Sequence, residues 1–451
     1  MGIAGAEIAE FVAATVAASG QPGRVVEAVE EAARRAMGRI GQAMIENAVA
    51  MHVHQVGPVP SCPTCSGPVV AKGVRQKTVR TLSGPVRVRR PWSHCPACRS
   101  GFAPADEALG LTTTVSPALA KAYAMAGMDL PFGHAAALVH EVAAIAVSAS
   151  TLARSCRAAG QRAKARADAE TTASQTAVVS YLPPAGPAPS IGYVLMDGTG
   201  APMVPAETQQ RVGKAADGRA HTREVKIGLL FTQTQRDKDG APIRDPGSNS
   251  YIATFDDADH FADELTMEYI RRGFYRARQL IVIGDGAKWI WNLADRCWPE
   301  ATQIVDYYHA AEHVHDLVSM IDHVLARPGE LIDQLLSHLE RGDTPAMAAT
   351  IDALHLHPHL AAKTDKAIDY FTRNTRRMQY HHYREKGWFI GSGQVESACK
   401  TIVAQRAKQS GMRWTINGLT PILTLRTLHR SDRDYLIWEE NLSQTPLTQA
   451  A

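Results

Sequence analysis

The order of apolar and polar positions divides the chain into regions of different texture. Residues 1–55 carry apolar side chains at helical spacing in an Ala- and Glu-rich sequence, which predicts helices. Residues 60–108 are rich in Pro, Gly, Cys and β-branched residues, which predicts short strands. Helical spacing returns over 115–167. From residue 191, short apolar runs alternate with amphipathic segments, so we expect a mixed α/β region there.

The helical segment 115–167 has a break that predicts a helix, a short turn and a second helix capped by Ser148 or Ser150. Arg154 and Arg157 lie on the second helix. A helix-turn-helix places its second helix in the DNA major groove in this way, which would make both arginines DNA contacts. A plain helical hairpin fits the pattern equally well.

The α/β region predicts a series of strands separated by turns and helices. Its apolar runs are "IGYVLMDGTG", "TREVKIGLLFTQ", "SNSYIATFDD", "LIVIGDGA" and "QIVDYYHA". Residues 313–385 are helical again, and "GSGQVESACK" is a Gly turn that leads into a helix. The stretch 171–190, by contrast, has the composition of a linker.

Composition excludes several classes of protein. Apolar residues make up 45% of the 451 positions and charged residues 21%, which is typical of a globular protein with more than one domain. No run of about 18 apolar residues occurs, so we expect no membrane span. The N-terminus lacks the basic start of a secretory signal, and the chain has seven cysteines without a disulfide-like pattern. Both features favour the cytoplasm.

Positive charge is concentrated in one part of the chain, although the net charge is only +3. The window from Asn47 to Ala105 contains no Asp or Glu. A solvated face usually mixes both signs, so this block predicts a nucleic-acid-binding surface. The residues that we predict to contact DNA here are Arg75, Lys77, Arg80, Arg87, Arg89 and Arg90.

Two cysteine pairs flank this basic block. Cys62 and Cys65 form one Cys-x2-Cys motif, Cys95 and Cys98 form another, and 29 residues separate them. Each pair places two thiolates on one tight turn, so together they predict a closed, structural tetrathiolate site for one Zn²⁺. The intervening sequence reads as two strands joined by a Ser-Gly turn, which is typical of a zinc ribbon.

Three acidic residues are candidates for a catalytic metal site. Asp197 and Asp285 each follow an apolar run and precede a glycine, and Glu396 lies in a predicted helix. If the two strands are neighbours, both aspartates meet at one sheet edge, where a packed helix supplies the glutamate. Clustered carboxylates need cations, and two Mg²⁺ ions in such a site cut and rejoin phosphodiesters. A single Asp-Gly, however, is often an ordinary turn.

These motifs together resemble those of bacterial insertion-sequence transposases with a DDE triad, and more narrowly the ISKra-type family, which is related to Mutator-like transposases. The resemblance runs from about residue 60 to 435 and rests on "LMDGTG", "VIGDGAKWIW", "GSGQVESACK", "TREVKIGLLF" and "DYYHAAEH". It implies an RNase H-like core interrupted by a helical insertion. It also implies Mg²⁺-dependent cleavage and transfer of DNA strands at the terminal inverted repeats of the element.

The resemblance gives roles to further residues. His309 ends an Asp-x-x-His motif and would orient the active site, although a buried structural histidine fits as well. Lys400 lies four residues after Glu396 and would hold a DNA phosphate, although an ordinary ion pair with Glu396 fits the same spacing. Arg406, further along the same predicted helix, is a candidate DNA contact.

The predicted architecture is therefore multidomain, with a β zinc ribbon and helical DNA-binding segments before an α/β RNase H-like core. The expected parts are an N-terminal helical segment for oligomerisation (1–58), the zinc ribbon (59–108), the helical helix-turn-helix-like domain (109–170), the linker (171–190), the first part of the core (191–314), the helical insertion (315–385) and the second part of the core (386–451).

The function expected from these features is DNA transposition by a homo-oligomer, a dimer or larger, that binds double-stranded DNA at both the terminal repeats and the target. One alternative is a transposase-derived DNA-binding protein without catalytic activity. Another is a zinc metalloprotease, because His309, Glu312 and His313 match the His-x-x-Glu-His pattern. That match follows a predicted strand rather than lying on a helix, which disfavours the protease.

Overall fold

The computed structural model of the chain describes residues 3–18, 23, 25–57, 59–176, 188–209, 211–213 and 217–438. Its contacts divide the chain into two compact units, an N-terminal unit (1–156) and a C-terminal unit (157–451). The boundary lies inside a helix of the segment that we predicted as one domain, 109–170. None of the helices within the described residues is both long and apolar enough to cross a bilayer.

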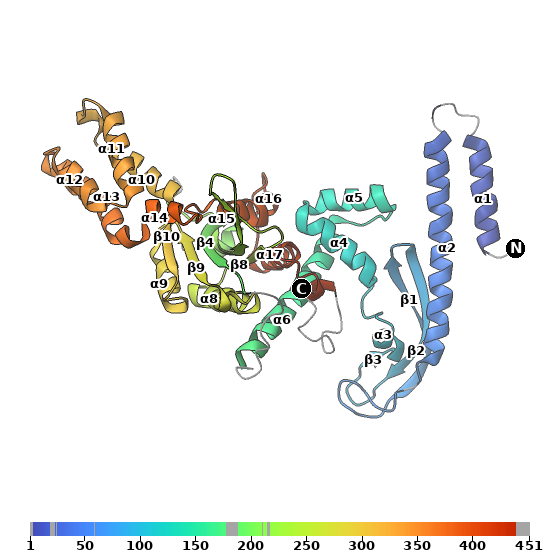
Figure 1. Cartoon of the computed structure of the whole chain (residues 1–451). Coiled ribbons are helices and arrows are strands. Elements are labelled where there is room, and N and C mark those ends of the chain that lie inside the picture. The colour runs from blue at the N-terminus through green and yellow to red at the C-terminus, as the bar shows by residue number, and fades with distance from the viewer. Residues whose placement is uncertain are drawn as a thin grey trace. The chain divides into compact units, whose positions relative to one another are not determined.

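The N-terminal unit combines a long helical hairpin, a three-stranded antiparallel sheet in the order β1-β2-β3, and a helical part. Helix α2 lies along the β1–β2 hairpin (Figure 1). The elements of the unit are α1 (Ile3–Ala18), α2 (Val25–Gln55), β1 (Val70–Thr81), β2 (Gly84–His94), β3 (Gly101–Phe102), α3 (Pro104–Ala108), α4 (Pro117–Asp129), α5 (Phe132–Ala143) and the first turns of α6 (Ala149–Thr176).

Alternation along the strands explains how this sheet packs. In β2, Val86 and Val88 are buried while Arg87 and Arg89 are exposed, because successive side chains point to opposite faces. The valines form one core with Val53 of α2. A second core joins α4, α5 and the start of α6 through Leu119, Tyr123, Val139 and Leu152. The helix, turn and second helix predicted over 115–167 are confirmed, with Ser148 accepting a hydrogen bond from the backbone N–H of Thr151 at 3.2 Å.

The C-terminal unit is built on a five-stranded mixed sheet in the order β10-β9-β4-β5-β8. Strand β4 pairs in parallel with β9, which pairs in parallel with β10, while β4 with β5 and β5 with β8 are antiparallel. The five strands predicted from apolar runs are confirmed. The strands are β4 (Ile191–Pro202), β5 (Thr222–Gln233), β8 (Ser250–Thr254), β9 (Gln279–Gly284) and β10 (Thr302–Val305), with β6 (Gln235–Arg236) and β7 (Pro242–Ile243) as a separate small ribbon.

Helices cover both faces of this sheet. On one face, Gly228 of β5 leaves room for Phe261 and Leu265 of α8. The residues on either side of Gly228 in β5 point to the other face, because successive side chains of a strand alternate. That other face packs against α15 and against the π-helical segment that follows it, and both contact β4. The covering helices are α7 (Pro205–Thr208), α8 (Ala258–Arg271), α9 (Lys288–Cys297), α15 (Gly393–Ala398), the π-helical segment η4 (Cys399–Ala404), α16 (Gln405–Ala407), α17 (Ile416–Arg430) and α18 (Tyr435–Trp438).

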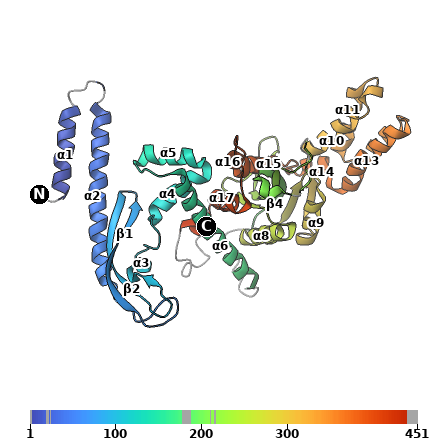
Figure 2. The same cartoon turned by 180° about the vertical axis from the view of Figure 1, so that it is seen from behind.

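A helical insertion separates β10 from α15. In both views it extends beyond the β10 edge of the sheet (Figures 1 and 2). Its helices are α10 (Tyr307–Ser319), α11 (Pro328–Arg341), α12 (Thr344–Asp352), α13 (Pro358–Asn374) and α14 (Tyr380–Glu385), with short 3₁₀ turns at Asp322–Val324 and Thr375–Arg377. A further 3₁₀ turn, Phe274–Arg276, lies outside the insertion, between α8 and β9.

Two boundaries differ from those expected from the sequence. Residues 171–176, which we expected in a linker, continue helix α6, because the Ala- and Thr-rich sequence there still forms helical hydrogen bonds. The rest of the expected linker, up to residue 187, lies outside the described residues. The strand expected over "QIVDYYHA" ends at Val305, because the Asp306 carboxylate accepts hydrogen bonds from Tyr308 and His309 and starts α10.

A buried ion cluster ties α8 to the C-terminal end of the unit. The Glu268 carboxylate is almost fully buried, and it accepts hydrogen bonds from Arg271 and from Arg433, the latter at 3.4 Å. Burial alone raises the pKa of Glu268, but the two guanidinium groups outweigh it and lower the pKa from 4.5 to about 2. The carboxylate is therefore held in its charged form by its partners.

We expect Glu268→Gln to lower the free energy of unfolding by about 3 kcal/mol at pH 7, because it leaves buried arginine charge uncompensated. Since the folded pKa of Glu268 is below the unfolded value, its contribution is complete above about pH 4.5 and disappears as the pH falls through about 2. Denaturant unfolding of both proteins between pH 7 and pH 2.5 measures this. A difference that stays constant over that range would contradict the charge-based explanation.

Candidate functional sites at the sheet edge and the cysteine cluster

The pairing of β4 with β9 brings Asp197 and Asp285 to the same edge of the sheet. Leu195 lies opposite Ile283 in parallel register, so Asp197 and Asp285 occupy equivalent positions two residues further along. Asp285 directly follows β9, as predicted. Asp197, however, does not end its strand, because β4 continues to Pro202 in pairing with β5. The turn expected at Gly198 is therefore wrong, and Asp197 lies where β4 extends past the end of β9.

The Asp197 carboxylate is held in a half-buried, polar position. Its Oδ2 accepts a hydrogen bond from the Cys399 thiol at 3.2 Å, and its Oδ1 accepts one from the backbone N–H of Gly198 at 2.6 Å. Burial raises the pKa of Asp197, and the Asp285 charge raises it further, while the two hydrogen bonds and His309 lower it. Burial is the largest of these effects, so the pKa of Asp197 rises mainly because its carboxylate is poorly hydrated.

Cys399, whose thiol reaches Asp197, begins a segment that is not a regular α-helix. Residues Cys399–Ala404 form a π-helical segment, η4, directly after α15. The buried guanidinium of Arg426 donates to the carbonyl oxygens of Thr401 and Ile402, the latter at 2.8 Å. Arg426 thus satisfies backbone carbonyls within a segment whose helical hydrogen bonding is irregular. Such π-turns are frequent at functional sites.

Glu396 lies on α15 next to this assembly, with its side chain exposed. The Ser392 hydroxyl is 3.4 Å from its Oε1, and the Glu396 charge contributes to raising the pKa of Cys399, behind the effects of burial and of Asp197. Ser392 also donates its backbone N–H, at 2.7 Å, and its hydroxyl to the buried Asp306 carboxylate at the end of β10. Asp306 therefore fixes the start of α15 relative to the sheet edge.

Two basic groups border the same edge. His309, on the first turn of α10, lies near enough to Asp197 to lower its pKa, so the structure brings this predicted residue to the site. Lys408 donates to the Thr199 hydroxyl at 2.7 Å, two residues along β4 from Asp197. Its charge lowers the pKa of Cys399, although burial raises that pKa more. Lys400, which we predicted to be in the site, is exposed.

The three acids do not converge as tightly as ligands of a single ion. Within the described part of the chain, one group of three or more His, Cys, Asp or Glu has all its ligand atoms within 4.8 Å of one another, and it consists of cysteines. Asp197, Asp285 and Glu396 thus border one edge of the sheet without reaching that separation. The electrostatic effect of Asp285 on Asp197, and of Glu396 on Cys399, is what connects them.

The cysteines identified from their spacing form the compact cluster. Cys62, Cys65, Cys95 and Cys98 lie together, with Sγ–Sγ distances of 3.6 Å for Cys62–Cys98 and for Cys65–Cys95. Four thiol sulfurs at these separations match the donor set of a structural tetrathiolate site, so the cluster is able to hold a metal such as zinc. The prediction that these four cysteines form a site able to bind a structural metal is confirmed.

The two cysteine turns are built alike. The backbone N–H of Cys62 donates to the Gly67 carbonyl at 2.8 Å, and the backbone N–H of Cys95 donates to the Ser100 carbonyl at 2.8 Å. The residue after the second cysteine of each pair has a left-handed backbone, with φ of 58° at Ser66 and 60° at Arg99. A Cβ at Gly67 would contact the sulfurs of Cys65 and Cys95, so glycine leaves the cluster its space.

Hydrogen bonding prepares part of the cluster for metal. The Ser100 hydroxyl lies 3.4 Å from the Cys62 sulfur and 3.0 Å from the Cys98 sulfur. This contact is the main cause that lowers the pKa of Cys62, to about 5, and the pKa of Cys98. The Cys65 pKa is raised to about 12, because hydrogen bonds with the other thiols outweigh the lowering effect of the Gly67 N–H. A divalent cation would relieve this repulsion between thiolates.

Part of the predicted basic surface is internal instead. Arg90 is buried and makes a two-pronged ion pair with Asp106, at 2.6 and 3.0 Å, and Lys77 is 3.4 Å from the same carboxylate. The burial of Arg90 contradicts its predicted contact with DNA, whereas Lys77 is half-buried and its predicted contact stays a prediction. The acid-free window ends one residue before Asp106, which α3 folds back against β1 and β2.

The remaining predicted DNA contacts fall into two groups. Arg406 is fully buried against Trp414, with the guanidinium carbon 4.9 Å from the ring centroid, so its predicted contact with DNA is also wrong. Arg157 is half-buried. Arg75 lies over Trp92 at 4.4 Å with its side chain still exposed. The other exposed members of the predicted set are Arg80, Arg87, Arg89 and Arg154.

The His-x-x-Glu-His segment has a different setting from the one expected. His309, Glu312 and His313 lie on α10, so this motif is helical, and the two imidazole rings are 4.8 Å apart. His313 instead packs against Tyr370 at 4.2 Å. The segment supplies no group of three close ligands within the described residues, since such a group occurs there only at the cysteines. A zinc protease site therefore has no support in this geometry.

Comparison with known proteins adds no assignment. No protein-family model matches the chain, and no curated protein matches it.

We expect Cys95→Ser to abolish binding of about one zinc ion per chain, because it removes a buried ligand of the closed site. Removal of the metal should also destabilise the N-terminal unit by about 3 kcal/mol or more. Metal content by mass spectrometry and thermal unfolding with and without a chelator measure both effects. Cys297→Ser, on α9 of the other unit, is the matched control and should retain the metal. Equal metal content in the two variants would refute a site at the cluster.

Proposed function

We propose that this chain is a DDE transposase, which cleaves DNA at the terminal inverted repeats of an insertion sequence and joins the freed ends to target DNA. The observation that carries the proposal is the register of β4 and β9, which sets Asp197 and Asp285 side by side at one sheet edge. Single Asp-Gly motifs are common, but here the two aspartates lie level on neighbouring parallel strands, at the sheet edge where α/β folds place ligand sites and where paired carboxylates suit phosphoryl transfer.

The architecture around this pair agrees with an RNase H-like core. A five-stranded mixed sheet holds both aspartates, a helical insertion follows β10, and the chain then returns to the sheet through α15, which carries Glu396. The order strand, strand, helix for the three acids is the order that the resemblance to ISKra-type transposases implies. The sheet and insertion support the proposal without depending on any single motif.

The residues at the edge are suited to Mg²⁺. The donor set is Asp197, Asp285 and Glu396, all oxygen ligands, which Mg²⁺ prefers. Burial, and to a smaller extent the Asp285 charge, raises the pKa of Asp197, and a bound divalent cation would oppose both effects. When bound, two such ions supply charge stabilisation for the attacking and leaving oxygens of a phosphodiester.

The protein's own groups would prepare the substrate in this mechanism. Asp197 is oriented by the Cys399 thiol and the Gly198 N–H, so its carboxylate has a fixed direction. Lys408, held at Thr199, provides a positive charge beside the same edge for a scissile phosphate. His309, on the first turn of α10, would move a proton or orient the phosphate in this mechanism.

The N-terminal unit would recognise DNA in this proposal. Its hairpin carries exposed Arg87 and Arg89 on the strand face opposite the core, and α6 begins as the second helix of a helix-turn-helix-like segment. A zinc ribbon fits the cysteine turns at the base of the hairpin. Pairing of two element ends requires at least two chains, and the α1–α2 hairpin is the proposed contact between them.

We expect Asp285→Asn to reduce DNA cleavage by at least about 100-fold, because the amide lacks the charge that holds Mg²⁺. The assay uses labelled duplexes taken from the DNA on either side of the gene, with Mg²⁺ present or absent, and follows strand nicks on a denaturing gel. DNA binding measured in parallel by gel shift should change less than about threefold, since Asp285 is not a phosphate contact.

The matched control is Asp239→Asn. Asp239 is an exposed carboxylate in the turn after β5, at the end of the sheet opposite Asp197, because Gln233 pairs with Ile191. The Asp239→Asn variant should cleave DNA at the same rate as the wild type. Cleavage at equal rates by the wild type and Asp285→Asn would refute the catalytic triad. Tight binding with no cleavage by either protein would favour the DNA-binding alternative.

A further inference from the structure

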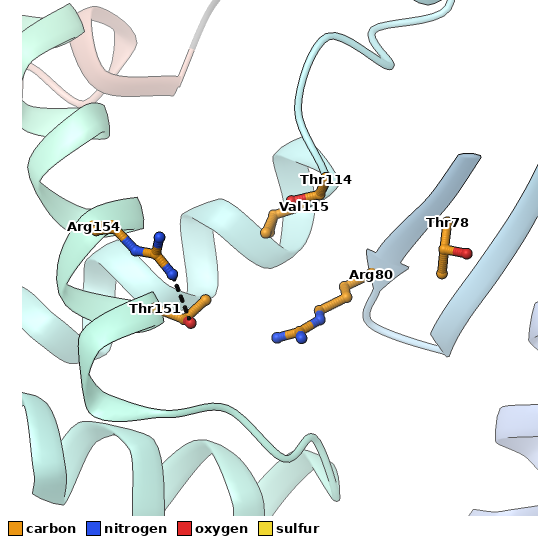
Figure 3. Close-up of a pocket in the computed structure, with 6 residues that line it drawn as sticks. All are labelled: Thr78, Arg80, Thr114, Val115, Thr151 and Arg154. Carbon is orange, nitrogen blue, oxygen red and sulfur yellow. Dashed lines mark hydrogen bonds between the residues drawn. The ribbon is translucent and has the colours of Figure 1, made fainter.

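A pocket of about 350 Å³ lies in the N-terminal unit between the β-hairpin and the start of α6. It is lined by two arginines, three threonines and one valine, and no acidic residue lines it. Figure 3 shows Arg80 extending from the end of β1 toward α6, from which Thr151 and Arg154 face the same space. The lining residues are Thr78, Arg80, Thr114, Val115, Thr151 and Arg154.

The walls of the pocket are fixed to one another by backbone contacts. Arg80 N–H donates to the Thr114 carbonyl at 2.9 Å, and Ser116 N–H donates to the Arg80 carbonyl at 2.8 Å, so the loop before α4 is attached to β1. Helix α4 in turn packs on α6, where Leu152 fills the space beside Gly127. The two arginines therefore come from separate elements that α4 holds in a set arrangement.

The charges of the pocket are not satisfied internally. Neither Arg80 nor Arg154 makes an ion pair with a carboxylate within the part of the chain that the structure describes, unlike Arg90 in the same unit. Arg154 donates to the Thr151 hydroxyl at 3.2 Å, which orients its guanidinium. The buried Tyr123 hydroxyl lies near Arg80: burial raises its pKa, and the Arg80 charge partly offsets this. Two guanidinium groups that line one pocket, with nearby hydroxyls, are a donor set for a phosphate.

We propose that this pocket binds a single phosphate group, which Arg80 and Arg154 share, and that in the working protein this group belongs to the backbone of duplex DNA. The inference deepens the proposed function and relies on it for the source of the phosphate. It places one DNA strand across the junction between β1 and α6, so that the hairpin and the helix contact adjacent parts of one duplex. The alternative source of the same chemistry is free inorganic phosphate.

The test is a double-mutant cycle in the full-length, zinc-loaded protein. Binding of a fluorescent 30-base-pair duplex is measured by anisotropy at several salt concentrations for wild type, Arg80→Gln, Arg154→Gln and the double variant. We expect each single change to weaken binding about tenfold and to reduce the slope of log Kd against log salt by about one. Because one phosphate is shared, the double variant should lose little more, and its slope should also fall by about one in total.

Arg89→Gln is the matched control, since Arg89 is an exposed arginine of the same hairpin outside the pocket. Its effect should add fully to that of Arg154→Gln. Additive losses for Arg80→Gln and Arg154→Gln, with the slope falling by about two, would overturn the shared phosphate. Unfolding temperatures of all variants identify any that fail to fold, and a neutral Arg80→Met variant, which keeps most of the apolar length of the side chain, replaces Arg80→Gln if that protein is unstable.

A second titration, with inorganic phosphate and followed by calorimetry, separates the two sources. Weak phosphate binding that both arginine variants abolish, with duplex binding unchanged, supports the pocket and assigns it to free phosphate. Loss of neither ligand in either variant refutes the site. The result is independent of cleavage: loss of cleavage in Asp285→Asn leaves this binding cycle unaffected, so failure of either proposal is recognisable by itself.

Discussion

The position of β4 at the centre of the sheet is the constraint from which the candidate active site follows. Parallel pairing with β9 on one side sets Asp197 level with Asp285, and antiparallel pairing with β5 on the other lets β4 continue past that level to Thr199. A shift of one residue in either register would turn Asp197 to the opposite face, toward α8. The apolar residues that precede Asp197, all fully buried, make such a shift unfavourable, so hydrophobic burial determines where the charge lies.

Both candidate sites concentrate negative charge that the protein does not fully neutralise by itself. At the cysteine cluster, Ser100 stabilises thiolates while the neighbouring sulfurs raise the pKa of Cys65. At the sheet edge, burial and Asp285 raise the pKa of Asp197. Glu268 differs, because Arg271 and Arg433 outweigh its burial and lower its pKa. The contrast is between a buried carboxylate whose pKa neighbouring arginines lower and an aspartate whose pKa burial and a second carboxylate raise.

The sequence predicted those features that depend on local pattern. The cysteine spacing identified the cluster, and the apolar runs identified all five strands of the large sheet, because each signal is contained within a few residues. What failed depended on contacts between distant residues. Arg90 looks like a surface charge until Asp106 is placed beside it, and Arg406 does so until Trp414 covers it. Cys399 and Lys408 had no recognisable signal, since their positions at Asp197 and Thr199 follow from the packing of η4 on the sheet.

The π-helical segment has a consequence for how this region tolerates changes in length. A π-turn contains one residue more than an α-helical turn, so every side chain after it is rotated by about 100° from where a regular helix would carry it. Lys408 donates to Thr199 from a helix rotated in this way. The buried Arg426 stabilises the π-helical segment by donating to its Ile402 carbonyl. Deleting one residue between 399 and 404 would convert the segment to an ordinary α-helix with better backbone bonding. The helix would gain regularity while its downstream charge turned away from the sheet, which sets local stability against the alignment of the edge.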